Sequence, residues 1–137
     1  MLRAETRSRA RALQLLYAWE IQGRPALTDV ACGVARLLGP RPKVLDDAEL
    51  RASGVVACPA ALDRLVADAA HHWRLERIGL VERNILRLGI LELQDVLVPP
   101  KTAIDEAVTL AHRFGDVRAP AFVNGVLDRI ARTLGRL

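Results

Sequence analysis

Glycine and proline residues divide this chain into stretches whose apolar side chains recur every three or four positions. The first stretch, Arg3 to Ile21, contains neither residue type. Such spacing predicts helices with one buried face, and the Gly or Pro that follows each stretch ends the helix. Helices are expected at 3–21, at 27–38, from Pro59 to a turn at 74–79, at 80–96, from about 102 to 114, and from Pro120 onward. No stretch alternates strictly between apolar and polar residues, so the predicted fold class is all-α, a bundle of about six or seven helices.

The expected core follows from the same spacing. The helix at 80–96 carries apolar residues on two sides, with Ile85 and Leu88 on one and Ile90 and Leu93 on another, so it is expected at the centre. Core positions expected on the other helices are Leu13, Leu15, Leu16, Tyr17, Trp19 and Ile21; Leu62, Leu65, Val66 and Ala69; Ile104, Ala107, Val108 and Ala111; and Val123, Val126, Leu127, Ile130 and Leu134.

Local signals also predict where helices begin and end. Thr28 or Asp29 is expected to cap the second helix, and Thr102 with Asp105 resembles a capping box. Gly39, Pro40 and Pro42 stop the second helix, and the variable, least regular segment is expected at about 39–59, with room for a short helix at 46–52. In the helix that follows, the side chains expected to face water are Asp63, Arg64 and Asp68.

Size and composition limit the class of protein. The 137 residues suit one domain, 1–137, and the 20 basic residues, 18 of them Arg, exceed the 16 acidic ones to give a net charge of +4. This charge allows a polyanionic partner but does not require one. Every stretch of about 18 residues contains charges, and no apolar run follows the basic N-terminus, so no membrane partner is expected and the expected location is cytoplasmic.

Few residues suggest catalysis or metal binding. The sequence lacks a phosphate-binding glycine loop with Lys, GxSxG and HExxH, and Asp105 and Glu106 fit the first turn of a helix, where acidic side chains are favourable. Two separate cysteines do not combine with the three histidines into a ligand set. A charged surface that faces solvent or a partner accounts for a group of interspersed Glu and Arg residues: Glu76, Glu82, Glu92, Arg74, Arg77, Arg83 and Arg87. No catalytic residue, metal or cofactor is expected.

The distribution of arginine is more informative. Arg3, Arg7, Arg11 and Gln14 are spaced four, four and three residues apart, so they line one side of the first helix. Two interpretations stay open for this stripe: a solvated helix face, or a strip that contacts phosphates through guanidinium groups.

The start of the last helix carries a second candidate site. Phe122 lies about 100° from the stripe of Val123 and Val126, so it is expected to be partly exposed. An exposed aromatic at a helix N-terminus can stack on an unpaired base, although local packing is the alternative. Asn124 and Gly125 also leave a local and a binding role open. A helical Gly lowers stability relative to Ala, and close approach of another surface is one reason to keep it.

Taken together, these positions resemble the NusB family of bacterial transcription antitermination factors. The blocks that carry the resemblance occur in the family's order and span nearly the whole chain: Arg7-Ser8-Arg9, Ala12 to Glu20, Glu82 to Leu88 with Glu92 and Leu93, Pro100 to Val108, and the run FVNGVLD from Phe122 to Asp128. The segment Asp116 to Ala119 and the region 39–59 match no family block.

The resemblance implies an all-helical fold of two packed three-helix bundles that form one RNA-binding domain, without catalytic activity, metal or cofactor. It implies binding to boxA-type single-stranded RNA of nascent ribosomal RNA together with NusE, a small-subunit ribosomal protein, within the RNA polymerase antitermination complex. The RNA-binding residues it implies are Arg3, Arg7, Arg9, Arg11, Gln14, Tyr17, Lys101, Phe122 and Asn124, and the residues implied for the protein partner are Glu82 and Arg83. For Tyr17 the ring can be core, with only the hydroxyl left for a partner.

Three alternatives stay open on the sequence alone. A NusB-like domain can guide RNA to a fused methyltransferase domain, although this sequence contains no such domain. It can also be a helical adaptor that binds only protein. Self-association of the free protein is a further open point.

Overall fold

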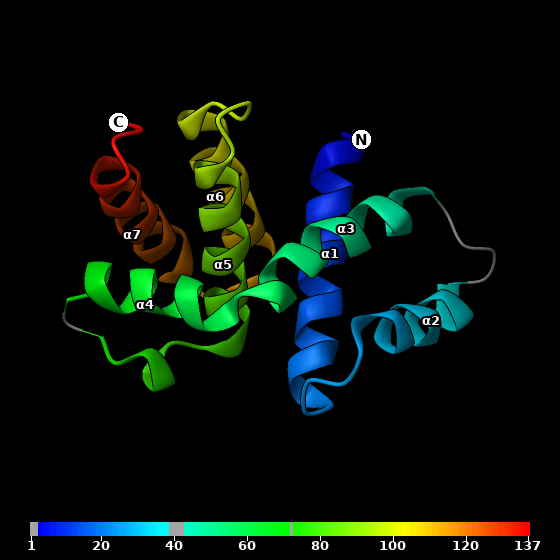
Figure 1. Ribbon diagram of the computed structural model, residues 1–137. Helices are drawn as coiled ribbons and strands as arrows, with labels where there is room; N and C mark the ends of the chain where they lie inside the picture. The colour runs from blue at the N-terminus through cyan, green and yellow to red at the C-terminus, as the bar shows by residue number, and fades with distance from the viewer. Residues whose placement is uncertain (1–2, 39–42, 72) are drawn as a thin grey trace. The chain divides into compact units, whose positions relative to one another are not determined.

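A computed structural model describes residues 3–38, 43–71 and 73–137 (Figure 1). These residues form seven α-helices and one short 3₁₀ helix and contain no strand, so the all-α prediction is confirmed. The chain divides into two compact units, Met1–Ala57 and Cys58–Leu137. The first unit has the expected three helices, whereas the second has four α-helices and the 3₁₀ helix.

The first unit contains α1 (Ala4–Ile21), α2 (Leu27–Leu38) and α3 (Lys43–Ala57), and each helix packs against the other two. The helix α3 occupies most of the segment that the sequence predicted as irregular. Its buried residues, Leu45, Ala48, Ala52 and Val55, follow helical spacing and are fully inaccessible to solvent. The short helix allowed at 46–52 lies within α3, but the rest of α3 was predicted as irregular because two of the four buried residues are alanines, which give a weak apolar signal. The predicted stop at Gly39, Pro40 and Pro42 lies outside the described residues.

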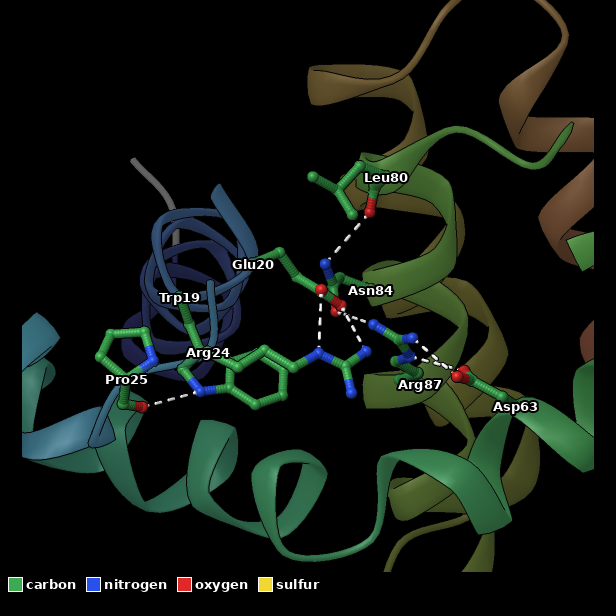
Figure 2. A network of polar contacts seen from close by, with 8 residues as sticks. All are labelled: Trp19, Glu20, Arg24, Pro25, Asp63, Leu80, Asn84 and Arg87. Carbon is green, nitrogen blue, oxygen red and sulfur yellow. Dashed lines mark hydrogen bonds and ion pairs between the residues drawn. The ribbon is translucent and has the colours of Figure 1, made fainter. Parts of the chain in front are cut away.

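The turn between α1 and α2 is held by side chains of both its ends. Gly23 and Arg24 adopt left-handed backbone, with φ of +82° and +63°. Such a conformation costs little for Gly but is uncommon for Arg. The Arg24 guanidinium forms an ion pair with Glu20 at 3.2 Å and lies 4.8 Å above the Trp19 ring, and the Trp19 indole N–H donates to the Pro25 carbonyl oxygen at 3.0 Å (Figure 2). These contacts compensate for the strained residue and fix the end of α1.

The second unit contains α4 (Pro59–Ala69), η1 (Leu75–Arg77), α5 (Leu80–Gln94), α6 (Pro100–Phe114) and α7 (Ala119–Thr133). The helix α5 packs against α4, α6 and α7, which confirms its predicted central place (Figure 1). Gly89 lets the helices approach closely, because a Cβ added there would lie 2.8 Å from Leu127 Cδ1 and 3.5 Å from the Ala107 Cβ.

A buried arginine links α4 to α5. Arg87 is fully buried; its Nε donates to Asp63 Oδ1 at 2.7 Å, and its Nη2 donates to Asp63 Oδ2 at 2.8 Å (Figure 2). Its Nη1 donates to Asn84 Oδ1 at 2.9 Å, and the Asn84 amide donates to the Leu80 carbonyl oxygen at 3.1 Å. The predictions of a surface role for Arg87 and a water-facing Asp63 were therefore wrong, because each charge is neutralised by the other.

The residues predicted to cap α2 and α6 lie inside these helices. The helix α6 begins at Pro100 with Pro99 as its N-cap and no side-chain cap, so Thr102 lies inside the helix and the predicted capping box does not form. The helix α2 likewise begins at Leu27, with Thr28 and Asp29 inside its first turn. The start of α7 has a cap that the sequence did not reveal, because Asp116 Oδ1 accepts from the backbone N–H groups of Arg118 at 2.8 Å and Ala119 at 3.0 Å.

Most predicted core positions are buried, with exceptions at helix edges and ends. Leu134, just beyond α7, is 36% exposed, and Leu65 and Val108 are half-buried. On α1, Tyr17 is 45% exposed and Ile21 is 64% exposed, so neither belongs to the core. Both residues lie at the border of the apolar face of α1, where the spacing of apolar residues does not distinguish buried side chains from exposed ones.

Candidate nucleic-acid interface

The arginine stripe of α1 is present as a surface feature, here called the basic strip (Arg3, Arg7, Arg11 and Gln14). Arg3, Arg7 and Gln14 are exposed, and Arg11 is half-buried. The Nη1 of Arg11 donates to Gln14 Oε1 at 2.7 Å, which aligns these two side chains along the helix. The strip therefore presents guanidinium groups in a row, the arrangement that contacts with successive phosphates require.

Tyr17 and Ile21 extend the basic strip toward the end of α1. Tyr17 follows Gln14 by three positions and Ile21 follows Tyr17 by four, so all lie along one side of the helix. Tyr17 is 45% exposed, which argues against the alternative that its ring belongs to the core. Ile21 was missed as a surface residue, although extending the spacing of the strip would have found it.

Arg9 lies apart from the basic strip. It is only 9% exposed, and its neighbours Ser8 and Ala10 are buried as well. Two residues of helix place Arg9 about 200° around the axis from Arg7, so one surface cannot use both side chains equally. The structure thus separates two residues that the family resemblance had paired.

The second unit carries the other expected RNA-binding residues. Lys101 is exposed in the first turn of α6, Asn124 is exposed on α7, and Phe122 is half-buried, as its position in the sequence predicted. Gly125 is also exposed, and a Cβ added to it would meet no atom within 4 Å among the described residues. No described residue therefore approaches Gly125 closely enough to account for a glycine at this helical position.

A cavity of about 330 Å³ lies beside Phe122 and is here called the Trp73 cavity. Trp73 is 51% exposed, and its ring contacts that of Phe122 in a T-shaped arrangement, with centroids 5.8 Å apart and planes inclined by 68°. The lining residues are Trp73, Arg77, Ile78, Gly79, Glu82, Asp116, Arg118, Ala119 and Phe122. Sequence reasoning missed Trp73, which follows α4 in a stretch without helical spacing and so gave no signal beyond being one of two tryptophans.

The two residues predicted for the protein partner are both half-buried. The Glu82 carboxylate occupies space left by two glycines: an added Cβ would lie 2.2 Å from Oε2 at Gly79 and 3.3 Å from Oε1 at Gly115. Glu82 lines the Trp73 cavity together with Phe122, so residues expected for different partners share one site. The Nε of Arg83 is buried and has no hydrogen-bond partner within the described structure.

The described ranges contain no cluster of three or more His, Cys, Asp or Glu residues that could hold a metal ion. His72 of the sequence analysis lies outside them. None of the helices in these ranges is long and apolar enough to cross a membrane. Cys32 is exposed on α2, Cys58 is half-buried, and neither forms a disulfide.

Comparisons with known proteins agree with this architecture. The NusB family model matches residues 6–132. The chain is 44% identical over 135 residues to a transcription antitermination protein NusB from Sorangium cellulosum, with 98% of this chain and 96% of that protein covered. The structure of T. maritima NusB superimposes with a TM-score of 0.79 at 31% identity, covering 96% of this chain and 93% of that one.

A further solved structure is described as antitermination factors NusB and NusE in complex with dsRNA. One of its chains matches with a TM-score of 0.80 at 27% identity, covering 97% of this chain and 99% of that one. Because the family model and the relatives cover nearly the full length, the chain belongs to the NusB family.

Proposed function

We propose that this chain is a transcription antitermination factor that binds boxA-type single-stranded RNA of nascent ribosomal RNA together with NusE, and that it acts within the RNA polymerase antitermination complex. The observation that carries the proposal is the near full-length similarity to relatives named for antitermination. The likeness to a chain of a complex of NusB and NusE with dsRNA supports NusE and RNA as partners. The family match spans both units, which supports treating residues 1–137 as one RNA-binding domain.

Within this function the basic strip holds phosphates, and Tyr17, Lys101, Phe122 and Asn124 supply aromatic and polar contacts to RNA. The exposure of Arg3, Arg7 and Gln14 supports this assignment. Arg9 contributes less to RNA than the resemblance implies, because its side chain is almost entirely buried. Arg83 and Glu82 stay assigned to the protein partner by resemblance, and the protein acts by binding, without catalysis, in the cytoplasm.

Sequence preference requires unpaired bases, because an A-form duplex hides most base edges from side chains. The test is fluorescence anisotropy with a labelled single-stranded boxA-type RNA, with and without NusE, over a range of salt concentrations. A duplex of the same length is the matched control. We expect the single strand to bind more tightly than the duplex, and NusE to strengthen that binding.

If about four phosphates are contacted, the logarithm of the association constant falls against the logarithm of salt with a slope near −3, from about −0.7 per contact. No binding to either RNA at low salt, with or without NusE, would overturn the proposal. Binding to NusE alone, with no added stability from RNA, would favour the protein-only adaptor. Preference for the duplex would overturn the single-stranded assignment only.

A further inference from the structure

The Trp73 cavity is large enough to hold a small ligand or a single base. Its volume of about 330 Å³ falls at the lower end of the ~300–1,000 Å³ usual for small-ligand sites. It lies entirely within the second unit, between the loop that follows α4, the start of α5 and the start of α7. Its residues come from two stretches far apart in the sequence, 73–82 and 116–122, so the fold brings them together.

The aromatic pair provides a surface for stacking. In this edge-to-face contact, with planes inclined by 68°, the two rings cover at most one face of one ring, so the contact leaves other ring faces open for stacking. Trp73 is also half-exposed, although a tryptophan side chain gains from leaving water. Aromatic faces that remain open beside a cavity can stack with a nucleobase of any sequence.

Charged groups complete the site. Arg77 and Arg118 line the cavity and are both exposed, so their guanidinium groups can reach a phosphate or stack on a base. The Glu82 carboxylate accepts hydrogen bonds, as the amino and imino donors on the Watson–Crick edge of an unpaired base require. Asp116 is already engaged through Oδ1 at the start of α7, which makes Glu82 the stronger candidate for reading the base.

We propose that the Trp73 cavity binds one unpaired nucleobase of the RNA, stacked on the Trp73 ring beside Phe122, with its Watson–Crick donors toward Glu82 and its phosphate toward Arg77 or Arg118. This rests on the proposed function, because it requires that the chain binds RNA. An apolar side chain of a protein partner fits less well, since it would bury the Glu82 carboxylate without a donor. The inference moves Glu82 from the protein interface to the RNA site.

The test is a set of double-mutant cycles with single-stranded boxA-type RNA in the presence of NusE. Each base of the RNA is replaced in turn by an abasic nucleotide, and binding is measured for the wild type and for Trp73→Ala. At one position the abasic replacement should weaken wild-type binding by roughly 5- to 150-fold, the range for a stacked base. At that position the same replacement should have no further effect on Trp73→Ala.

Three further variants sharpen the result. Trp73→Phe keeps an aromatic face and should retain most of the affinity, which separates stacking from a folding defect. Glu82→Gln should change which base is preferred at the identified position. Val117→Ala is the matched control, because Val117 is 95% exposed beside Asp116 but does not line the cavity.

Additive effects of Trp73→Ala and abasic replacement at every position would overturn the base site while leaving RNA binding itself intact. Weaker binding of Trp73→Ala to NusE in the absence of RNA would show instead that the cavity holds a protein side chain. Failure of the wild type to bind RNA would overturn the proposed function, so the two proposals fail in different ways.

Discussion

The arginines of the basic strip and Arg87 of α5 are chemically identical but lie in opposite surroundings. Arg3 and Arg7 are exposed on α1 in the first unit. Arg87 is fully buried in the second unit, with both oxygens of one carboxylate as acceptors. The first group is exposed to solvent, where an external polyanion can reach it, whereas the charge of Arg87 is buried and neutralised within the fold.

The difference shows that the surroundings of an arginine, and not its residue type, decide whether it stabilises the fold or is exposed to an external partner. A guanidinium taken out of water is costly unless its charge is paired and its N–H groups have acceptors, and Asp63 and Asn84 meet this need for Arg87. Exposed arginines carry no such cost, so their removal should affect binding far more than folding. The effect of the buried pair on stability and the effect of the exposed arginines on binding can be measured separately.

The largest effect is expected from Asp63→Ala. This change leaves the Arg87 charge buried without its carboxylate, and breaking such a pair costs about 3–5 kcal/mol. We expect a value near the lower bound, about 3 kcal/mol in the free energy of unfolding measured with urea, since the Asp63 side chain is 18% exposed and water can partly replace it. Asp63→Asn should fall between the wild type and Asp63→Ala.

Asp68→Ala is the matched control for this comparison, because Asp68 lies on the same helix but is exposed. It should change the free energy of unfolding by no more than about 0.5 kcal/mol. Equal losses for Asp63→Ala and Asp68→Ala would show that the buried pair has no special part in stability.

The second effect concerns binding. The double variant Arg3→Ala and Arg7→Ala should weaken RNA binding by about 25-fold at 0.1 M salt, or about fivefold for each lost phosphate contact, from a slope of about 0.7 per contact. The slope against salt should become less negative by about 1.4, and the free energy of unfolding should change by less than about 0.5 kcal/mol.

A charge-matched control is the double variant Arg36→Ala and Arg64→Ala, since both arginines are exposed and neither belongs to the basic strip. It should leave RNA binding within a factor of about two, because its guanidinium groups make no phosphate contact to release counterions. If both double variants weaken binding equally, net charge and not the strip drives RNA binding.

The sequence predicted most of the fold because helical spacing, Gly and Pro act locally. The start of α4 at Pro59 and the end of α6 at Gly115 both follow from such signals. Only the middle of α3, at 46–52, was expected as a helix, because much of its buried face is alanine and its burial depends on α1, which is far away in the sequence. A long-range partner supplies what the local pattern lacks.

The candidate site was only partly predictable for the same reason. The basic strip is local, since its members share one helix, and its exposure follows from the spacing. The pairing of Arg87 with Asp63 and the contact of Trp73 with Phe122 join residues on different elements. No pattern within one helix could show that one arginine is buried or that an isolated tryptophan faces an aromatic ring.

The smallest expected effect concerns an exposed ion pair on α7, which can be compared with the buried pair of Arg87 and Asp63. Arg132 Nε lies 3.0 Å from Asp128 Oδ2, with side chains 66% and 40% exposed. Water screens this pair, and its two residues are one helical turn apart on the same helix. Asp128→Ala should therefore cost only about 0.3–0.5 kcal/mol in the free energy of unfolding. The loss should shrink in 1 M salt, whereas the loss caused by Asp63→Ala should persist, because screening acts on exposed charges more than on buried ones. If Asp128→Ala lowered the free energy of unfolding by about 3 kcal/mol, burial would not explain the difference in stability expected between the Arg132–Asp128 and Arg87–Asp63 pairs.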